Sequence, residues 1–267
     1  LQAQTRIKDQ QQVSGNWTLK GSPYIIEGEA IVPKGKELIV QPGVQVLFKT
    51  GENSVYQDPG FDMGMLRVNG KLRAIGAPGR FIEFTRNGSQ GYWGTILIEN
   101  DENLLLEYCR ISHGFQVDDV RESNFTSAFG TLSLHDCNAT IRHCILHDIE
   151  LWGIFLDNTQ LQLDYTTIIG AYTPIYIHEG EVTSVTNSLI YEYESDDFVD
   201  GYPVSKGVLQ YSLVQRSTIK QESTNTIGAQ PFWDDDFALL AGSPGKEMSK
   251  NEAEIGAYGE ETPYFSA

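Results

Sequence analysis

The middle of the chain repeats one six-residue pattern, Ile141-Arg142-His143-Cys144-Ile145-Leu146, Leu163-Asp164-Tyr165-Thr166-Thr167-Ile168 and Val185-Thr186-Asn187-Ser188-Leu189-Ile190. Every copy begins and ends with an apolar residue and has a small residue in its fourth position. Further copies run from Leu106 to Ile111 and from Leu209 to Val214. From Cys144 the small residue recurs after 22, 22 and 24 residues, at Thr166, Ser188 and Ser212. A fixed period of this size predicts a solenoid in which each repeat forms one coil.

Each copy alternates with period two and is rich in β-branched and aromatic residues, which predicts a strand. A second strand is expected upstream in each repeat, for example Gly153-Ile154-Phe155-Leu156, with turn-forming residues between the two. Successive coils then stack like strand on like strand, about 4.8 Å apart. The sequence therefore predicts one ladder of inward-facing small residues and places Ile168 and Ile190 in the core. The ladder contains Cys109, Cys144, Thr166, Ser188 and Ser212.

Two segments near the ends of the chain, together with the repeat, resemble a known family. The residues from Pro23 to Phe48 and from Leu66 to Gly76 resemble the opening coils of bacterial surface β-helices. Those from Phe237 to Pro244 and from Ile255 to Gly259 resemble the closing segment of the same group. With the repeat, the chain is similar to the right-handed parallel β-helix proteins of the pectate-lyase-like superfold.

The resemblance implies an all-β, single-domain right-handed parallel β-helix, a solenoid of about eight to ten coils. It covers residues 15–258, between a flexible N-terminal tail over 1–14 and a C-terminal tail over 259–267. It implies little about activity, because the superfold includes lyases, hydrolases, epimerases, adhesins and non-catalytic modules.

The expected location is outside the cell, either secreted or at the cell surface and associated with an outer membrane. No apolar run approaches the roughly 18 residues that a transmembrane helix requires. The sequence begins with Leu1 and not with Met. A removed preceding segment is therefore the expected carrier of an export signal or a lipid anchor.

The three cysteines are expected to differ in their surroundings. Cys109 and Cys144 occupy the ladder with parallel side-chain directions, which favours two buried free thiols over a disulfide. Cys137 lies in a polar turn between His135 and His143 and is expected to be exposed. Packing is the simpler interpretation for all three cysteines, and only Cys137 comes close to the histidine-rich setting that a catalytic thiol needs.

The charge excludes some classes of partner. The formal net charge is −17 at pH 7, and no lysine occurs between Lys71 and Lys206. Nucleic acids and anionic membranes select Lys and Arg, so neither is an expected partner. Cleavage of a uronate polymer requires a base beside a neutralised carboxylate, usually a Lys or Arg helped by a cation. The central coils therefore disfavour a polysaccharide lyase.

The exits of the repeated strands carry the first group of candidate residues. The ladder register places His113, Asp148, Gly170, Glu192 and Arg216 in one file and His147 in the neighbouring file. Histidine beside carboxylates can bind a metal or transfer a proton, while the alternative is a solvated turn. His113 and His147 are taken as candidate binding residues.

Two insertions break the period, one over 115–129 and one over 191–202, and loops on a rigid solenoid commonly carry the binding chemistry. The second contains the candidate sugar-stacking aromatics Tyr193, Phe198 and Tyr202. Its aspartates Asp196, Asp197 and Asp200 are candidate Ca²⁺ ligands, with no other cofactor expected. The alternative is an ordinary acidic loop.

These observations favour a non-catalytic module that binds an extracellular glycan or a surface protein, or that forms part of a larger surface assembly. The alternative is a carbohydrate-active enzyme, with a polysaccharide lyase preferred to a glycoside hydrolase. A deep cleft with converging titratable groups near His113 and His147 favours the enzyme, and a flat face with exposed aromatics favours binding.

Overall fold

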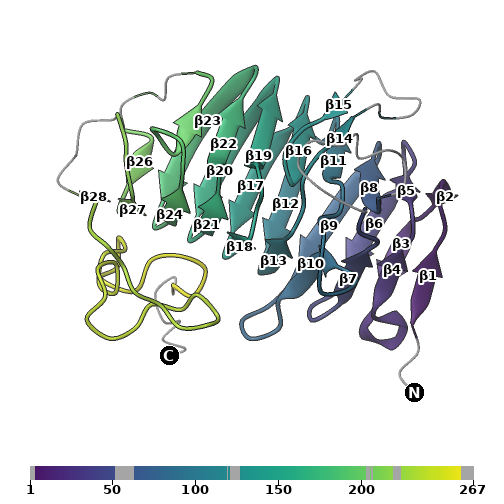
Figure 1. The fold of residues 1–267 in the computed structure, drawn as a ribbon, viewed down its shortest axis with the longest axis horizontal. Coiled ribbons are helices and arrows are strands. Elements are labelled where there is room, and N and C mark those ends of the chain that lie inside the picture. The colour runs from purple at the N-terminus through teal and green to yellow at the C-terminus, as the bar shows by residue number, and fades with distance from the viewer. Residues whose placement is uncertain are drawn as a thin grey trace, which may run out of the picture.

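The structure is a computed structural model that describes residues 4–51, 63–118, 120, 127–202, 205, 207–218 and 224–259. Its strands form three parallel sheets, and the chain passes through each sheet in turn as it winds along one axis (Figure 1). The molecule is therefore a right-handed parallel β-helix, as the family resemblance implied. We name the sheets A, B and C in the order in which each coil visits them.

Each sheet is built from one strand per coil. Sheet A contains β1 (Thr5–Ile7), β4 (Tyr24–Ile26), β7 (Gln45–Phe48), β10 (Ile82–Arg86), β13 (Cys109–Ser112), β18 (Ile145–His147), β21 (Thr167–Ala171), β24 (Leu189–Tyr193), β27 (Leu213–Val214) and β28 (Thr226–Ile227). Sheet B contains β2 (Gln11–Gln12), β5 (Glu29–Val32), β8 (Met65–Val68), β11 (Ile96–Glu99), β16 (Leu132–His135), β19 (Trp152–Asp157), β22 (Thr173–Ile177) and β25 (Val199–Asp200). Sheet C contains β3 (Gly15–Trp17), β6 (Glu37–Val40), β9 (Lys71–Ile75), β12 (Leu104–Glu107), β17 (Asn138–Arg142), β20 (Thr159–Asp164), β23 (Gly180–Thr186) and β26 (Leu209–Gln210).

Two elements lie outside these sheets. A short 3₁₀ helix, η1 (Leu19–Gly21), connects β3 to β4. An antiparallel hairpin of β14 (Val117–Asp118) and β15 (Ser127–Ala128) interrupts the path from sheet A to sheet B in the fifth coil.

The predicted ladder exists at the corner where the chain passes from sheet C to sheet A. The backbone N–H of Thr166 donates to Ser188 Oγ at 3.1 Å, and that of Ser188 donates to Ser212 Oγ at 3.0 Å. Asn225 continues the file, because its Oδ1 accepts from the Ser212 N–H at 3.2 Å. All five predicted ladder residues are fully buried. The pattern in the sequence therefore identified both the coil period and its inward face.

In the central coils, a residue in the left-handed conformation turns the chain at most corners. At the C-to-A corner, φ lies between 43° and 51° for Tyr108, His143, Tyr165, Asn187 and Tyr211. This conformation costs on the order of 1–2 kcal/mol for a residue with a Cβ atom. Ring stacking between coils offsets part of that cost: His143 stacks between Tyr108 and Tyr165, with centroid separations of 4.6 and 5.0 Å.

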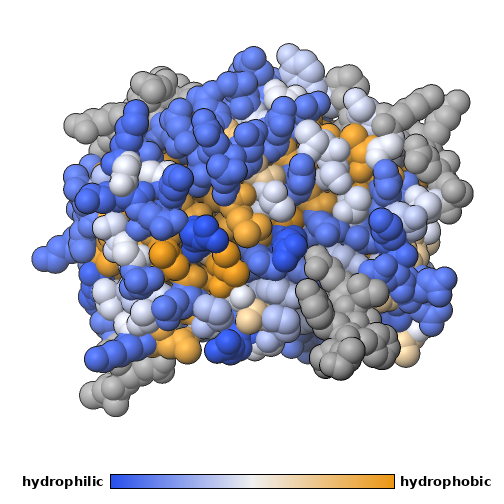
Figure 2. Space-filling view, turned by 180° about the vertical axis from the view of Figure 1, so that it is seen from behind, coloured by the Kyte–Doolittle hydropathy of each residue, from blue (hydrophilic) through white to orange (hydrophobic). Residues whose placement is uncertain are grey.

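The inward strand positions form one continuous apolar core. Ile168 and Ile190 are both fully buried and belong to it, as the alternation predicted. Hydrophilic residues dominate the outer surface seen in Figure 2, where hydrophobic residues are visible as a broken band across the middle. Among the described residues, the structure contains no helix long and apolar enough to cross a membrane.

The ends of the solenoid differ from the predicted boundaries. The expected tail over 1–14 contains β1 and β2, which pair with β4 and β5, so the first coil begins at Thr5. It was missed because β2 lies at the open edge with both residues exposed, which leaves no apolar alternation. At the other end, the last sheet strand is β28, and the expected solenoid over the following residues is absent from the described part of the chain.

Residues 229–259, which we call the C-terminal strap, fold back over the outer face of sheet A (the yellow loops in Figure 1). Leu239 and Ile255 of the strap pack on outward-facing Ile169, Leu189 and Leu213. The Ala257 N–H donates to Thr167 Oγ1 at 3.0 Å. The closing segments seen in the sequence thus cover a side of the solenoid.

The cysteines are all free and buried, which confirms the expectation for Cys109 and Cys144. The expectation that Cys137 is exposed is wrong, since only 3% of its surface is accessible. Asp136, in the left-handed conformation, turns the B-to-C corner within one residue. The next residue, Cys137, therefore points into the core. It forms a second ladder with Thr159, whose Oγ1 accepts from the Cys137 N–H at 3.3 Å.

We expect Ile168→Asp to destabilise the coil stack by on the order of 3–5 kcal/mol, because it buries a carboxylate without a partner. Thermal melting followed by circular dichroism measures this change. Gln162→Asp is the matched control: Gln162 is exposed on β20, and its replacement should change stability by no more than about 0.5 kcal/mol. Equal melting temperatures for the two variants would contradict the assigned strand faces.

Candidate functional site

His113 and His147 lie together at the corner between sheets A and B. His113, Asp148, Gly170 and Glu192 turn this corner in four successive coils, with φ between 51° and 72°. The register pairs Ser112 with His147, which places the two histidines in neighbouring files as the sequence predicted. Their rings meet edge to face with centroids 6.2 Å apart.

Asp148 links the two histidines. His147 Nδ1 lies 2.8 Å from Asp148 Oδ2, and His113 Nε2 lies 3.8 Å from the same oxygen. His113 Nδ1 also lies 2.9 Å from Ser112 Oγ. Ser112 is only 4% exposed, so this Ser–His–Asp contact presents no accessible nucleophile.

Burial favours the neutral form of both imidazoles. It lowers the pKa of His113, which the positive charge of Arg86 lowers further. It also lowers the pKa of His147 in spite of the attraction from Asp148. Phe237 of the C-terminal strap packs on the His147 ring, with centroids 4.7 Å apart. The histidine pair is thus partly covered by the strap.

The second insertion forms a cavity of about 490 Å³ beside this corner. Tyr172 and Tyr202 line it and are 48% and 56% exposed, among the most exposed aromatic residues of the described chain. We call it the tyrosine pocket; its other polar lining includes Glu194, Asp196, Asp197, Asp200 and Thr218. One of the three predicted aromatics and all three predicted aspartates therefore meet at one surface cavity.

The other two predicted aromatics are not available to a ligand. Tyr193 is 2% exposed and Phe198 is fully buried. The Tyr193 hydroxyl donates to the Arg216 carbonyl, and the Arg216 guanidinium donates to the Tyr193 carbonyl. Tyr193 follows the left-handed residue Glu192, which ends the alternation of β24, and both Tyr193 and Phe198 belong to the apolar core. They support the loop from beneath.

Two aspartates of the loop accept hydrogen bonds from their own surroundings. Asp197 Oδ1 accepts from the Phe198 N–H at 2.8 Å, and its Oδ2 accepts from the Thr218 N–H and Oγ1 at 2.6 and 2.5 Å. Asp200 Oδ1 accepts from the Gly201 N–H at 2.7 Å. Within the described residues, no three His, Cys, Asp or Glu side chains lie close enough to hold a metal ion. The Ca²⁺ hypothesis therefore gains no support from this geometry.

A second cavity, of about 720 Å³, lies where the C-terminal strap meets sheet A. Arg110 stands in it, 3.8 Å from Glu83, 3.2 Å from Asp236 and 3.0 Å from the Tyr258 hydroxyl. Burial raises the pKa of Glu83, and Arg110 opposes that shift. Because Asp236 and Tyr258 belong to the strap, this cluster ties the strap to the solenoid.

The first insertion covers the outer face of sheet B. Val117, Val120 and Ala128 pack on Met65 and Leu97 in a separate apolar cluster. Its polar residues Asp119, Arg121 and Glu122, together with Phe125, lie outside the described residues, as does the side chain of Asp118. The described part of this insertion has a structural role.

Comparison with known proteins finds no relative: no protein-family model, no curated protein and no solved structure matches the chain. The site is therefore judged on its own residues. Tyr172 and Thr218 also line the pocket and were not predicted from the sequence. Tyr172 directly follows the repeated strand β21, so its position at an exit was the available signal.

We expect no thiol of the native protein to react with Ellman's reagent at about pH 8, where an ordinary thiol begins to ionise. Cys137 has a pKa raised to about 11 by burial, and burial also raises that of Cys109. Denaturation should release three reactive thiols, because all three cysteines are free. The variant Tyr202→Cys provides the positive control, with one thiol that reacts at once. Rapid labelling of Cys137 in the native protein would contradict its buried position.

Proposed function

We propose that this protein is a non-catalytic β-helix module that binds a neutral glycan in the tyrosine pocket. The supporting observation is the presence of two exposed tyrosines and a set of carboxylates in a single cavity of about 490 Å³. Tyrosine rings offer an apolar face to the C–H groups of a sugar, and carboxylates accept hydrogen bonds from its hydroxyls. A cavity with a few converging polar groups is the usual form of a small-ligand site.

The charge of the pocket selects the kind of glycan. Four carboxylates line it, those of Glu194, Asp196, Asp197 and Asp200, while no Lys or Arg is among its described lining residues. A uronate or sulfated polymer would place like charges together and be repelled. A neutral sugar, or one with an amino group, fits the electrostatics. The pocket therefore favours neutral or amino sugars, which are a narrower class than the extracellular glycans expected from the sequence.

The pocket is held in shape before any ligand arrives. Asp197 bridges the loop to Thr218, and Ser195 Oγ donates to the Asp197 carbonyl at 2.7 Å. Phe198 and Tyr193 anchor the same loop in the core. A site that is already ordered loses less conformational entropy on binding, which favours affinity. Asp197 accepts three hydrogen bonds from the protein, which hold the loop in shape without a metal ion, so binding should not require Ca²⁺.

The proposal also implies a location. A glycan-binding module of this kind would act outside the cell, secreted or held at the surface, and a surface protein is the competing partner. The acidic surface is compatible with both. Retention of the protein by a neutral polysaccharide, measured without any second protein present, separates the two.

We expect Tyr172→Ala and Tyr202→Ala each to weaken glycan binding by about tenfold, because an aromatic contact contributes on the order of 1–2 kcal/mol. Glycan-array screening with neutral and acidic polysaccharides, followed by calorimetry on the best neutral ligand, measures this. Phe232→Ala is the matched control, since Phe232 is 46% exposed and lies outside the pocket. Binding should persist in EDTA. Preferential binding to acidic polymers, or equal loss in the control, would contradict the proposal.

We also expect no unsaturated product when the protein is incubated with pectin, alginate or a glycosaminoglycan. Arg110 is paired with carboxylates and His113 is partly buried, so neither is positioned as a free base. The ultraviolet absorbance of the unsaturated product measures lyase activity directly. If such a product formed, and formed no longer with Arg110→Ala or His113→Ala, the protein would be a lyase.

A further inference from the structure

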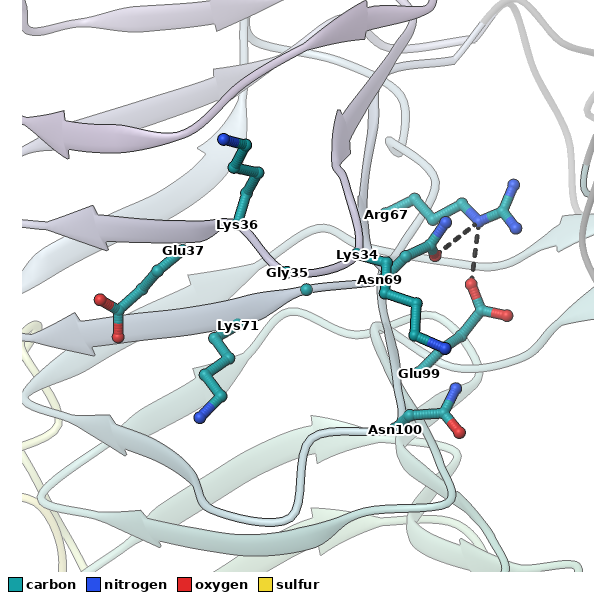
Figure 3. Close-up of a pocket in the computed structure, with 10 residues that line it drawn as sticks. Lys34, Gly35, Lys36, Glu37, Arg67, Asn69, Lys71, Glu99 and Asn100 are labelled. Atoms are coloured by element: carbon teal, nitrogen blue, oxygen red, sulfur yellow. Dashed lines mark hydrogen bonds and ion pairs between the residues drawn. The ribbon is translucent and has the colours of Figure 1, made fainter.

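The corner between sheets B and C carries a third cavity, near the N-terminal end of the solenoid. It has a volume of about 690 Å³ and lies across the turns that come after β5 and β8 (Figure 3). We call it the lysine pocket, lined by Lys34, Lys36, Lys71 and Arg67 and by the carboxylates of Glu37 and Glu99. The lysine pocket and the tyrosine pocket share no lining residue, so a ligand in one does not contact the residues of the other.

Positive charge is concentrated near this end of an acidic chain. The first 80 residues contain 10 of the 19 Lys and Arg residues but only 7 of the 36 Asp and Glu residues. Lys34, Lys36 and Lys71 are exposed, and among the described ion pairs none involves these three ammonium groups. Three lysine ammonium groups thus border one cavity against the single carboxylate of Glu37, since Glu99 is paired with Arg67.

The coil stacking brings two of these lysines together. The register pairs Lys71 with Glu37, and the Lys71 N–H donates to the Lys36 carbonyl at 2.9 Å, so Lys36 and Lys71 flank Glu37 on adjacent coils. In Figure 3, Lys36 and Lys71 extend to either side of Glu37, and Lys34 extends toward the side where Asn100 lies. Exposed lysine side chains change rotamer within nanoseconds. In this structure the three ammonium groups point in different directions, so binding one anion between them requires a change of rotamer.

Buried ion pairs fix the floor of the lysine pocket. Arg67 Nε lies 2.9 Å from Glu99 Oε2, and its Nη1 lies 3.6 Å from Glu29 Oε1, with all three side chains less than 10% exposed. Arg67 Nε also donates to Asn69 Oδ1 at 3.1 Å. This bond orients the Asn69 amide so that its NH₂ group remains available as a donor. The lysines, and not Arg67, supply the charge for a ligand, and Asn69 supplies a directed hydrogen bond.

We propose that the lysine pocket binds a compact oxyanion, the phosphate or sulfate monoester of a larger molecule. Lysine ammonium groups suit such an anion because each donates short, charge-assisted hydrogen bonds from a mobile point charge. A long polyanion is excluded by the negative charges farther along the same corner. The next coils present exposed Asp136, Glu179 and Glu181, which would repel a chain laid along the axis.

The test uses the full chain and the variant Lys34→Gln/Lys36→Gln/Lys71→Gln. Calorimetric titration with inorganic phosphate and with inorganic sulfate, at constant ionic strength in chloride, should show saturable binding to the wild-type protein. The triple variant should bind at least about tenfold more weakly, because it loses three charge-assisted contacts. The control Lys8→Gln/Lys20→Gln/Lys250→Gln removes the same charge from exposed lysines outside the pocket. Its affinity should stay within about twofold of the wild type.

Two outcomes overturn the proposal: no saturable binding of either anion, or equal weakening in both triple variants, which would indicate a general charge effect. Vesicles containing phosphatidic acid distinguish the sources of the anion. Binding to these vesicles that is lost only in the pocket variant identifies a lipid headgroup. Binding of the free anions without binding to vesicles identifies a soluble or glycan-linked monoester.

Discussion

The structure depends on satisfying backbone N–H groups where the chain turns between sheets. Within a strand, each N–H reaches a carbonyl of the neighbouring coil, but the turn at a corner breaks this match. At the C-to-A corner a side chain of the next coil accepts instead, as Ser188 Oγ does for Thr166 and Ser212 Oγ does for Ser188. An unsatisfied buried N–H would cost about 1–3 kcal/mol at each coil. The corner therefore requires a small side chain that accepts one hydrogen bond.

The same side chain also donates, and this explains which residues can occupy the ladder. Thr166, Ser188 and Ser212 each donate to the carbonyl two residues earlier, at 2.7–3.0 Å. Cys144 makes the corresponding contact through Sγ at 3.2 Å. A thiol is a weaker donor and acceptor than a hydroxyl but has the same valence and a similar size. Ser, Thr and Cys interchange in this file because they share one hydrogen-bonding pattern.

This constraint also sets what could be predicted from the sequence. The ladder and its flanking apolar residues repeat at a fixed spacing, so the fold, the coil register and the inward faces of Ile168 and Ile190 were predictable. The first coil was not, because β2 lies at an open edge where burial imposes no alternation. The position of the C-terminal strap was not predictable either, since its apolar residues contact outward positions of distant coils.

The candidate site was only partly accessible to the same reasoning. Composition located the acidic loop that forms the tyrosine pocket, but it could not separate Tyr202, which is exposed, from Tyr193, which is buried. That difference depends on the left-handed turn at Glu192, after which the alternation of the strand no longer holds, and on the contact with Arg216. Lys36 and Lys71 are 35 positions apart in the sequence and become neighbours only through coil stacking. Sites of this kind are set by register, which a local motif does not encode.

The C-terminal strap has a consequence for how the molecule unfolds. An isolated solenoid behaves as a one-dimensional array, in which each repeat is stabilised only by its nearest neighbours and the ends fray independently. Here Tyr258 contacts Arg110, Phe237 contacts His147, Ala257 contacts Thr167 and Trp233 contacts Tyr191, one partner in each of four successive coils. Fraying of the last coils therefore requires the strap to detach from the earlier ones. The strap converts the second half of a modular array into a single cooperative unit.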